Sequence, residues 1–186
     1  MEVMRRRMMM IAAGLVLVGA GVATACATVQ RPDGGEGHLA VGQPAPKLSG
    51  VDQDGKTRSV ADAAGGYLLV YFYPKDGTPG CTAEACAFRD AWERFEKAKV
   101  TIFGVSGDDQ ASHAEFAAEH RITFPLIADP DGVWSQGFGV GSFLGMTERV
   151  SFVIGPEGNV VAMYPDVDPG VHADQVLADI ARLRGE

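Results

Sequence analysis

Two cysteines follow an apolar run in the middle of the chain, and the first lies where a helix is expected to begin. Residues 71–90 read YFYPKDGTPGCTAEACAFRD, which is an apolar stretch, a turn rich in proline and glycine, and then a helical pattern that opens at Cys81. A helix start leaves backbone N–H groups unpartnered and carries partial positive charge, so it favours an anion. Because the thiolate is the nucleophilic form of cysteine, Cys81 is a candidate nucleophile.

The residues just before Cys81 suit a pre-organised pocket. Thr78 lies three positions earlier and is expected to bring its hydroxyl beside the sulfur, and Pro74 and Pro79 stiffen the turn and shield it. A second reading stays open on these residues alone. In it, Thr78 caps the helix and Cys81 is a small buried hydrophobe.

Cys86 adds a second thiol on the same predicted helix. Five residues of helix separate two Cα atoms by roughly 8 to 9 Å, which exceeds the span of about 7 Å that a disulfide tolerates. A bond between Cys81 and Cys86 would therefore need the helix to unwind locally. The spacing favours a pair that cycles between dithiol and disulfide over a permanent staple, and it differs from the C-x-x-C of thioredoxin-like reductases.

The motif Pro74-x-x-x-Thr78-x-x-Cys81 resembles the peroxidatic motif of the peroxiredoxins. The longer stretch YPKDGTPGCTAEAC resembles their bacterioferritin comigratory protein or PrxQ branch. The likeness runs from about residue 41 to the C-terminus and includes GVSGDD, FPLIADPDG and ERVSFVIGPEG. It departs from the family at residues 139–147, GVGSFLGMT, which are shorter than the corresponding region of many relatives. That loop is expected to border the active site or a dimer contact.

This resemblance implies an α/β protein with a thioredoxin-like fold, in which a central mixed sheet is flanked by helices. It implies a peroxidase that needs no cofactor and no metal: Cys81 becomes a sulfenic acid, Cys86 resolves it into a disulfide, and a thioredoxin-like dithiol protein reduces that disulfide. The resemblance also implies that the substrates are hydrogen peroxide and organic hydroperoxides and that the role is antioxidant defence. It implies that the protein is a monomer. Arg149, at the head of ERVSFVIG, matches the arginine that peroxiredoxins bring beside the peroxidatic sulfur.

Several charged and histidine residues have weaker assignments. Glu84 and Arg89 fall inside the matching stretch and are candidates for adjusting the electrostatics of the pocket, although a charge on an exposed helical face is usually only solvated. The remaining histidines of the domain show no metal-ligand spacing with the cysteines and are expected at the surface or at helix ends. They are His113, His120 and His172.

The N-terminal part of the chain predicts export. Residues 1–25 combine a short basic start with an apolar run from residue 8 to 25, the pattern of a secretory leader. Three fates stay open: lipid modification of Cys26 after the sequence Ala-Thr-Ala, ordinary cleavage at small residues, or retention as a membrane anchor. Each predicts a location outside the cytoplasmic membrane, in a bacterial cell envelope or periplasm. Residues 26–40, rich in glycine and polar residues, are expected to form a flexible tether to the domain at 41–186.

Apolar patterning orders the elements of that domain. It predicts a hairpin around residues 53–56 after an element at 44–48, a central strand at 67–73, a helix at 81–97, and strands at 100–106 and 124–128. Helices are expected at 110–120, 133–138 and 171–183, and a second hairpin at 149–154 and 159–164. The helix at 81–97 has one buried stripe formed by Ala85, Phe88, Trp92 and Phe95.

Composition limits the classes of function. The chain has 186 residues, 46% hydrophobic residues and a net charge of −8, which fits one globular domain and argues against a nucleic-acid partner. Two other classes stay open beside the peroxidase. A protein thiol–disulfide oxidoreductase would use the same fold, and a non-catalytic or copper-binding envelope protein would explain export and paired cysteines.

Overall fold

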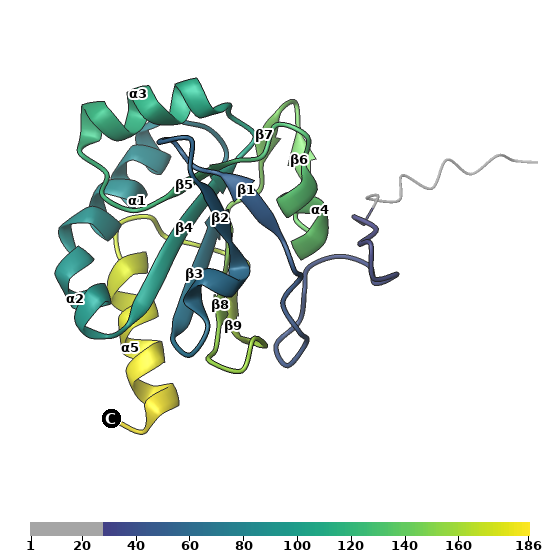
Figure 1. The fold of residues 1–186 in the computed structure, drawn as a ribbon, viewed down its shortest axis with the longest axis vertical. Coiled ribbons are helices and arrows are strands. Elements are labelled where there is room, and N and C mark those ends of the chain that lie inside the picture. The colour runs from purple at the N-terminus through teal and green to yellow at the C-terminus, as the bar shows by residue number, and fades with distance from the viewer. Residues whose placement is uncertain (1–27) are drawn as a thin grey trace, which may run out of the picture.

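A five-stranded mixed sheet with helices on both faces forms the body of the computed structural model, which describes residues 28–186 (Figure 1). The strands of this sheet are β3 (Tyr67–Phe72), β4 (Val100–Ser106), β5 (Leu126–Ala128), β8 (Val150–Ile154) and β9 (Val160–Tyr164). The helices are η1 (Val60–Ala63), α1 (Pro79–Asp90), α2 (Trp92–Lys97), α3 (Gln110–His120), α4 (Val133–Phe138) and α5 (His172–Arg184). Two small hairpins pair β1 (Ser49–Val51) with β2 (Thr57–Ser59) and β6 (Ser142–Phe143) with β7 (Met146–Thr147).

The central strand, β3, organises the sheet, whose order is β5-β4-β3-β8-β9. It pairs in parallel with β4 and antiparallel with β8, which makes the sheet mixed, as the sequence predicts. Successive side chains of a strand point to opposite faces. Leu69 and Tyr71 therefore join the core beneath α1, α2 and α5, whereas Val70 and Phe72 join the core beneath α4. Figure 1 shows these two groups of helices on opposite sides of the sheet.

Most predicted elements are present, with three differences. The predicted helix at 81–97 is two helices, because the chain leaves helical geometry at Ala91, where ψ is 2°. Residues 44–48 form no strand of their own; Pro44 makes an isolated bridge to Asn159, and the first strand is β1. The β6–β7 hairpin inside residues 139–147 and the short helix η1 lie where no element was predicted.

Residues 28–40, here called the N-terminal strap, fold against the domain, which differs from the flexible tether that their composition suggests. Arg31 is buried and donates from Nη1 to the carbonyl oxygen of Gly37 at 2.7 Å, so the backbone of the strap surrounds its guanidinium. Leu39 is only 2% exposed, and its N–H donates to the carbonyl oxygen of Phe138. One apolar side chain and one internally satisfied arginine thus hold a glycine-rich segment in place.

The predicted leader at 1–25 and the candidate lipid site Cys26 lie outside the described residues. Within residues 28–186, no helix has both the length and the apolar character needed to cross a bilayer.

Candidate active site

Cys81 lies at the end of the central strand, in the first turn of α1. The chain leaves β3, turns through Pro74, and enters α1 with Thr78 as N-cap and Pro79 as the first helical residue. Proline suits that position because the first turn of a helix has no intrahelical partner for its N–H. The thiol of Cys81 is free and only 1% exposed. The helix start that the sequence predicts is therefore present, with the sulfur in a nearly closed pocket.

Arg149 reaches this sulfur from the neighbouring strand. It immediately precedes β8, which pairs with β3, and its Nη2 donates a hydrogen bond to Cys81 Sγ at 3.2 Å. Its other terminal nitrogen, Nη1, pairs with Glu84 Oε2. One guanidinium therefore bridges the thiol and a carboxylate. The structure brings together the two residues that the sequence argument linked across the chain.

Glu84 is buried, in contrast to the solvated helical charge that was the alternative. It lies one turn after Cys81 on α1, its side chain is 0% exposed, and Oε1 has no hydrogen-bond partner among the described residues. Burial raises the pKa of this carboxyl to about 7, although the charge of Arg149 opposes the rise. A buried acid that titrates near neutrality, next to a reactive sulfur, is a feature of functional sites.

Thr78 and Pro74 occupy the turn that was predicted, but one contact differs. The Thr78 hydroxyl donates to the carbonyl oxygen of Lys75 at 3.1 Å instead of bonding the sulfur. It therefore closes the turn on itself in this state. Pro74 lines a cavity together with Arg149, so it forms part of the approach to the site.

Cys86 lies in the same helix, α1, and is half-buried with a free thiol. Arg89 is its neighbour: Nη1 donates to the carbonyl oxygen of His120 at the end of α3, and the ion pair with Asp90 raises the pKa of Arg89, with Cys86 contributing. Cys81 and Cys86 thus share one intact helix in a dithiol state. Arg89 lies near the second thiol, whereas Glu84 lies one turn from the first.

A buried polar network that sequence reasoning missed supports the turn before Cys81. Asp76, inside the turn, accepts hydrogen bonds from the Tyr73 hydroxyl and the Ser112 hydroxyl, each at 2.8 Å, and lies 2.8 Å from His113 Nδ1. Burial would raise the pKa of Asp76, but His113 and the hydroxyl donors lower it overall. His113 also lies 3.2 Å from the carbonyl oxygen of Ile127 through Nε2. The network fastens the turn before Cys81 to α3.

The expectation of a surface or helix-end position is wrong for His113, which is 0% exposed inside α3. His120 and His172 lie at helix ends as expected, although His172 is also 0% exposed. His172 begins α5 but lies inside, with Nε2 2.9 Å from the Ser151 hydroxyl, and burial lowers its pKa to about 4. A signal existed for His113, because it shares one face of α3 with the buried Phe116 and Ala117.

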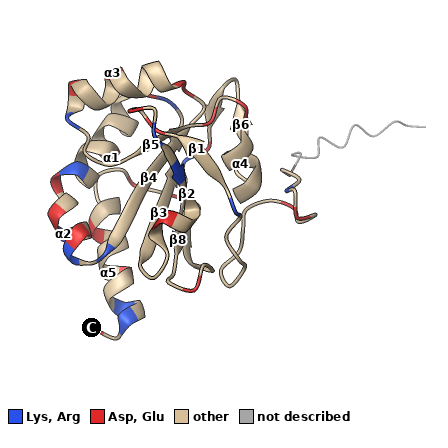
Figure 2. Ribbon diagram, in the orientation of Figure 1, with Lys and Arg blue, Asp and Glu red and all other residues tan. Residues whose placement is uncertain are grey.

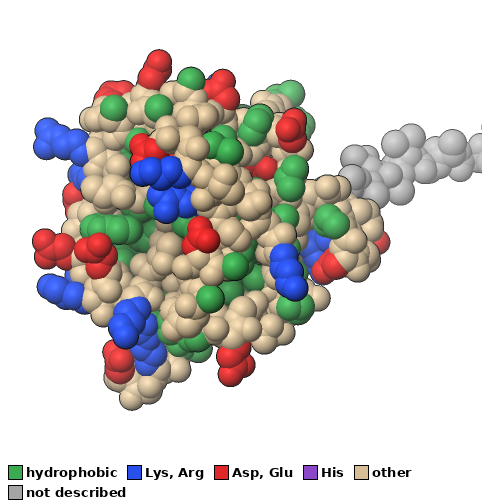
Figure 3. All heavy atoms as spheres, viewed as in Figure 1, with side chains coloured by type: hydrophobic (Ala, Val, Ile, Leu, Met, Phe, Trp, Pro, Cys, Tyr) green, Lys and Arg blue, Asp and Glu red, His purple; other side chains and the backbone are tan. Residues whose placement is uncertain are grey.

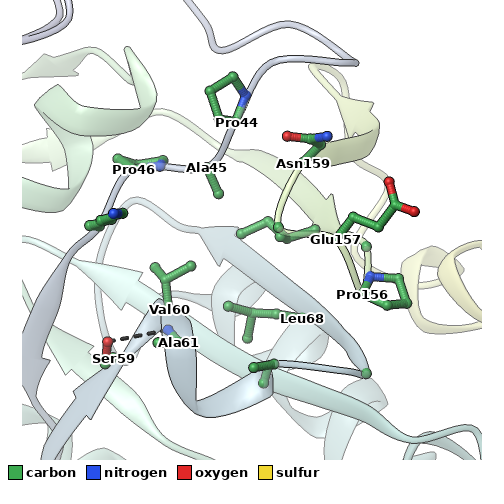
Figure 4. A pocket seen from close by; sticks show the side chains of 17 residues that line it. Pro44, Ala45, Pro46, Ser59, Val60, Ala61, Leu68, Pro156, Glu157 and Asn159 are labelled. Carbon is green, nitrogen blue, oxygen red and sulfur yellow. Dashed lines mark hydrogen bonds between the residues drawn. The ribbon is translucent and has the colours of Figure 1, made fainter.

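Two cavities differ in their relation to the cysteines. A cavity of about 710 Å³ adjoins the site and is lined by Pro74, Arg149 and Thr147 with residues of the strap and of the β6–β7 hairpin. Another of about 480 Å³ lies at the start of β3, under the β8–β9 turn, where Figure 4 shows Val60 and Leu68 among its apolar lining. Its lining holds no cysteine or histidine. Cys81 lines neither cavity, but Arg149, which donates to its sulfur, lines the first, so the first cavity lies nearer the site. The loop at 139–147 borders the site as predicted.

Comparison with known proteins agrees with this geometry. The family model described as the AhpC/TSA family matches residues 41–163. The chain belongs to the AhpC/TSA family. It is 41% identical over 139 residues to a chloroplastic peroxiredoxin Q of Populus jackii, a match that covers 73% of this chain and 65% of the relative. It is 36% identical over 146 residues to a putative peroxiredoxin bcp of Coxiella burnetii, covering 75% and 97%.

Solved structures of the same group superpose well on the described domain. The crystal structure of peroxidoxin BcpB from Mycobacterium tuberculosis matches with a TM-score of 0.74 and 31% identity over 79% of this chain and 99% of that one. A bacterioferritin comigratory protein from Xanthomonas campestris matches with a TM-score of 0.71 and 33% identity over 79% and 100%. The predicted family and the thioredoxin-like fold are confirmed. The chain spans 65% of the poplar relative's length, less than two thirds.

Proposed function

We propose that this protein is a thiol-dependent peroxidase in which Cys81 is the nucleophile. The observation that carries the proposal is the guanidinium of Arg149 within 3.2 Å of a buried sulfur at a helix start. The guanidinium supplies a hydrogen-bond donor and a positive charge at the sulfur, and the helix start adds partial positive charge. Pro74 and Arg149 line a cavity next to this site. In the proposed reaction, a peroxide enters this cavity from solvent and reaches the Cys81 thiolate past Arg149.

The first step transfers one oxygen to sulfur. The Cys81 thiolate attacks the nearer peroxide oxygen, the S–O bond forms, the O–O bond breaks, and the departing oxygen leaves as water or an alcohol after it takes a proton. Arg149 stabilises the charge that moves onto the departing oxygen. Thr78 orients the peroxide once its hydroxyl turns from Lys75, and Pro74 shields the reacting atoms. The product on the enzyme is a sulfenic acid.

The second step regenerates the thiol through Cys86. The Cys86 thiol attacks the sulfenic sulfur, a disulfide forms and water leaves. Because both cysteines lie in α1, the helix must open between them before the sulfurs meet. A thioredoxin-like dithiol protein then reduces the disulfide and becomes oxidised itself.

The substrates we propose are hydrogen peroxide and organic hydroperoxides, which makes antioxidant defence the role. The Xanthomonas campestris relative is described through its alkyl peroxide reduction activity, which supports the organic substrates. We also propose that the N-terminal residues export the protein to the cell envelope, with Cys26 as the candidate lipid anchor, and that the domain acts as a monomer.

Peroxide consumption by the full chain with a dithiol reductant tests the proposal. Wild type should remove hydrogen peroxide, Cys81→Ser should remove the activity, and Cys86→Ser should react once and stop at a sulfenic acid that a dimedone probe traps. Matched far-ultraviolet circular dichroism of the three proteins checks the fold. A wild type no faster than Cys81→Ser would refute the peroxidase and favour disulfide exchange or a binding role.

A further inference from the structure

The β6–β7 hairpin carries an exposed apolar tip beside the active-site cavity. Phe143 is 74% exposed, Leu144 is 82% exposed and Met146 is 45% exposed. Figure 3 shows hydrophobic side chains at the surface over this hairpin. Single exposed apolar residues are ordinary, but a group of them next to a catalytic cavity marks an interaction site.

The backbone of the tip shows that an apolar residue is kept there against local preference. Leu144 has φ of 51° and Gly145 has φ of 75°, and they are the two residues that link the Phe143–Met146 pair. Positive φ at both positions defines a type I′ turn, which favours Asn-Gly. Leucine is uncommon in the left-handed region. An asparagine would suit both the turn and the solvent, so local folding does not explain this leucine.

The hairpin is joined directly to the reacting groups. The Thr147 N–H lies 3.4 Å from the carbonyl oxygen of Pro74, and only Glu148 separates β7 from Arg149. Phe143 and Met146 line the same cavity, about 710 Å³, as Pro74 and Arg149. An apolar chain entering past the hairpin would therefore lead to Arg149, whose Nη2 donates to Cys81 Sγ.

The position at which the chain enters the domain indicates what covers the tip. Thr28 and Val29, the first described residues, line this same cavity, and the apolar run at 8–25 ends just before them in the sequence. Residues 132–147 contain no charged side chain, and Figure 2 shows α4 and β6 without charge colour. If the apolar run lies in a membrane, the cavity and the uncharged hairpin face the lipid surface at close range.

We propose that the β6–β7 hairpin inserts into the lipid surface and that the cavity takes the oxidised acyl chain of a membrane lipid. The inference rests on the proposed peroxidase function and names one substrate for it. The hydroperoxide group enters between Pro74 and Arg149, the Cys81 thiolate takes its outer oxygen, and the lipid leaves as the corresponding alcohol. Phe143, Leu144 and Met146 supply the apolar contact that a free peroxide does not use.

Full-length protein in phosphatidylcholine vesicles that contain phosphatidylcholine hydroperoxide tests this proposal. In Leu144→Asn, at a residue that does not line the cavity, we expect kcat/KM on the lipid hydroperoxide to fall about tenfold, as loss of one buried apolar side chain implies. Activity on hydrogen peroxide should stay within about twofold in the same samples. Leu144→Asn should also unfold at the same or a higher temperature, because asparagine suits the turn.

Leu183→Ser is the matched control, since Leu183 is 49% exposed on α5 and does not line this cavity. It should leave both activities unchanged. Equal losses on lipid hydroperoxide and hydrogen peroxide, or no loss on either, would overturn the proposal. A change confined to the KM for the dithiol reductant would also overturn it, because the hairpin would then be a docking site for a protein. Dissociation of a wild-type dimer by the substitution would overturn it as well. Failure of the proposed function itself is distinct, because wild type would then consume neither peroxide.

Discussion

Replacing Arg149 separates the stability of the site from its chemistry. Arg149 donates to Cys81 Sγ through Nη2 and pairs with Glu84 through Nη1, so Arg149→Met removes both contacts at once. Methionine keeps much of the apolar stem, which limits the change to the guanidinium. Glu84 is then left 0% exposed with neither carboxyl oxygen paired, since Oε1 already has no partner among the described residues.

The size of each effect follows from this geometry. Breaking a buried ion pair costs about 3–5 kcal/mol of folding stability. Because the Arg149 side chain is 20% exposed, we expect Arg149→Met to lose about 3 kcal/mol, the lower end of this range. Loss of a donor that stabilises developing charge lowers the rate by about 100-fold to 1,000-fold. Above pH 7 an unpaired Glu84 must either stay charged or take up a proton on folding, and Glu84→Gln removes that cost, so the double variant should regain about 2 kcal/mol of stability. It should regain no activity, because the sulfur still lacks its guanidinium.

Urea unfolding of the reduced proteins and stopped-flow reaction with hydrogen peroxide measure the two effects on the same samples. The four proteins of the cycle are wild type, the two single variants and the double variant. A double variant no more stable than Arg149→Met would contradict the ion-pair argument. A reaction rate in Arg149→Met within a few fold of wild type would contradict the catalytic role of the guanidinium.

Two further predictions concern the buried acid and the strap. Because burial raises the pKa of Glu84 from 4.5 to about 7, the folded state holds a proton that the unfolded state releases between these values, so stability should fall by about 3 kcal/mol as pH rises from 4.5 to 7. Urea unfolding across this pH range should show that the free energy of unfolding of Glu84→Gln changes less with pH than that of wild type. Equal slopes for the two proteins would refute the raised pKa of Glu84. Leu39→Ala should lower stability by about 2 kcal/mol or more because Leu39 is 2% exposed. Thermal unfolding of Leu39→Ala is compared with that of Val41→Ala, a control at a position that is 60% exposed. Equal melting temperatures for the two variants would show that the strap does not pack against the domain.

The sequence was sufficient for most of the elements and for the position of Cys81 at a helix start because those depend on local pattern. The continuous apolar run at 67–73 predicts a strand buried on both faces, and β3 lies at the centre of the sheet. The turn with Pro74 and Thr78 predicts a helix start at the cysteine, and α1 begins two residues earlier, at Pro79. Local backbone chemistry thus carries most of the information about this part of the site.

The remaining parts depend on contacts between distant segments, which no local pattern reveals. Glu84 has the spacing of an exposed helical charge, and it is buried only because Arg149, which lies just before β8, pairs with it. His113 becomes an interior residue because Asp76 meets it across 37 positions of sequence. The strap has the composition of a tether, and its packing depends on Leu39 and on carbonyl groups that converge on Arg31.

The position of Glu84 links the two proposed steps of the reaction. It lies between Cys81 and Cys86 in α1, and the helix must open over this segment before a disulfide can form. Opening withdraws the carboxylate from Arg149, so the ion pair that holds the guanidinium beside the sulfur must break before resolution. The pair therefore stabilises the closed helix while Cys81 meets its peroxide. Its loss is part of the free-energy cost of bringing Cys86 to the sulfenic acid, which makes one buried contact both a support for the first step and a barrier to the second.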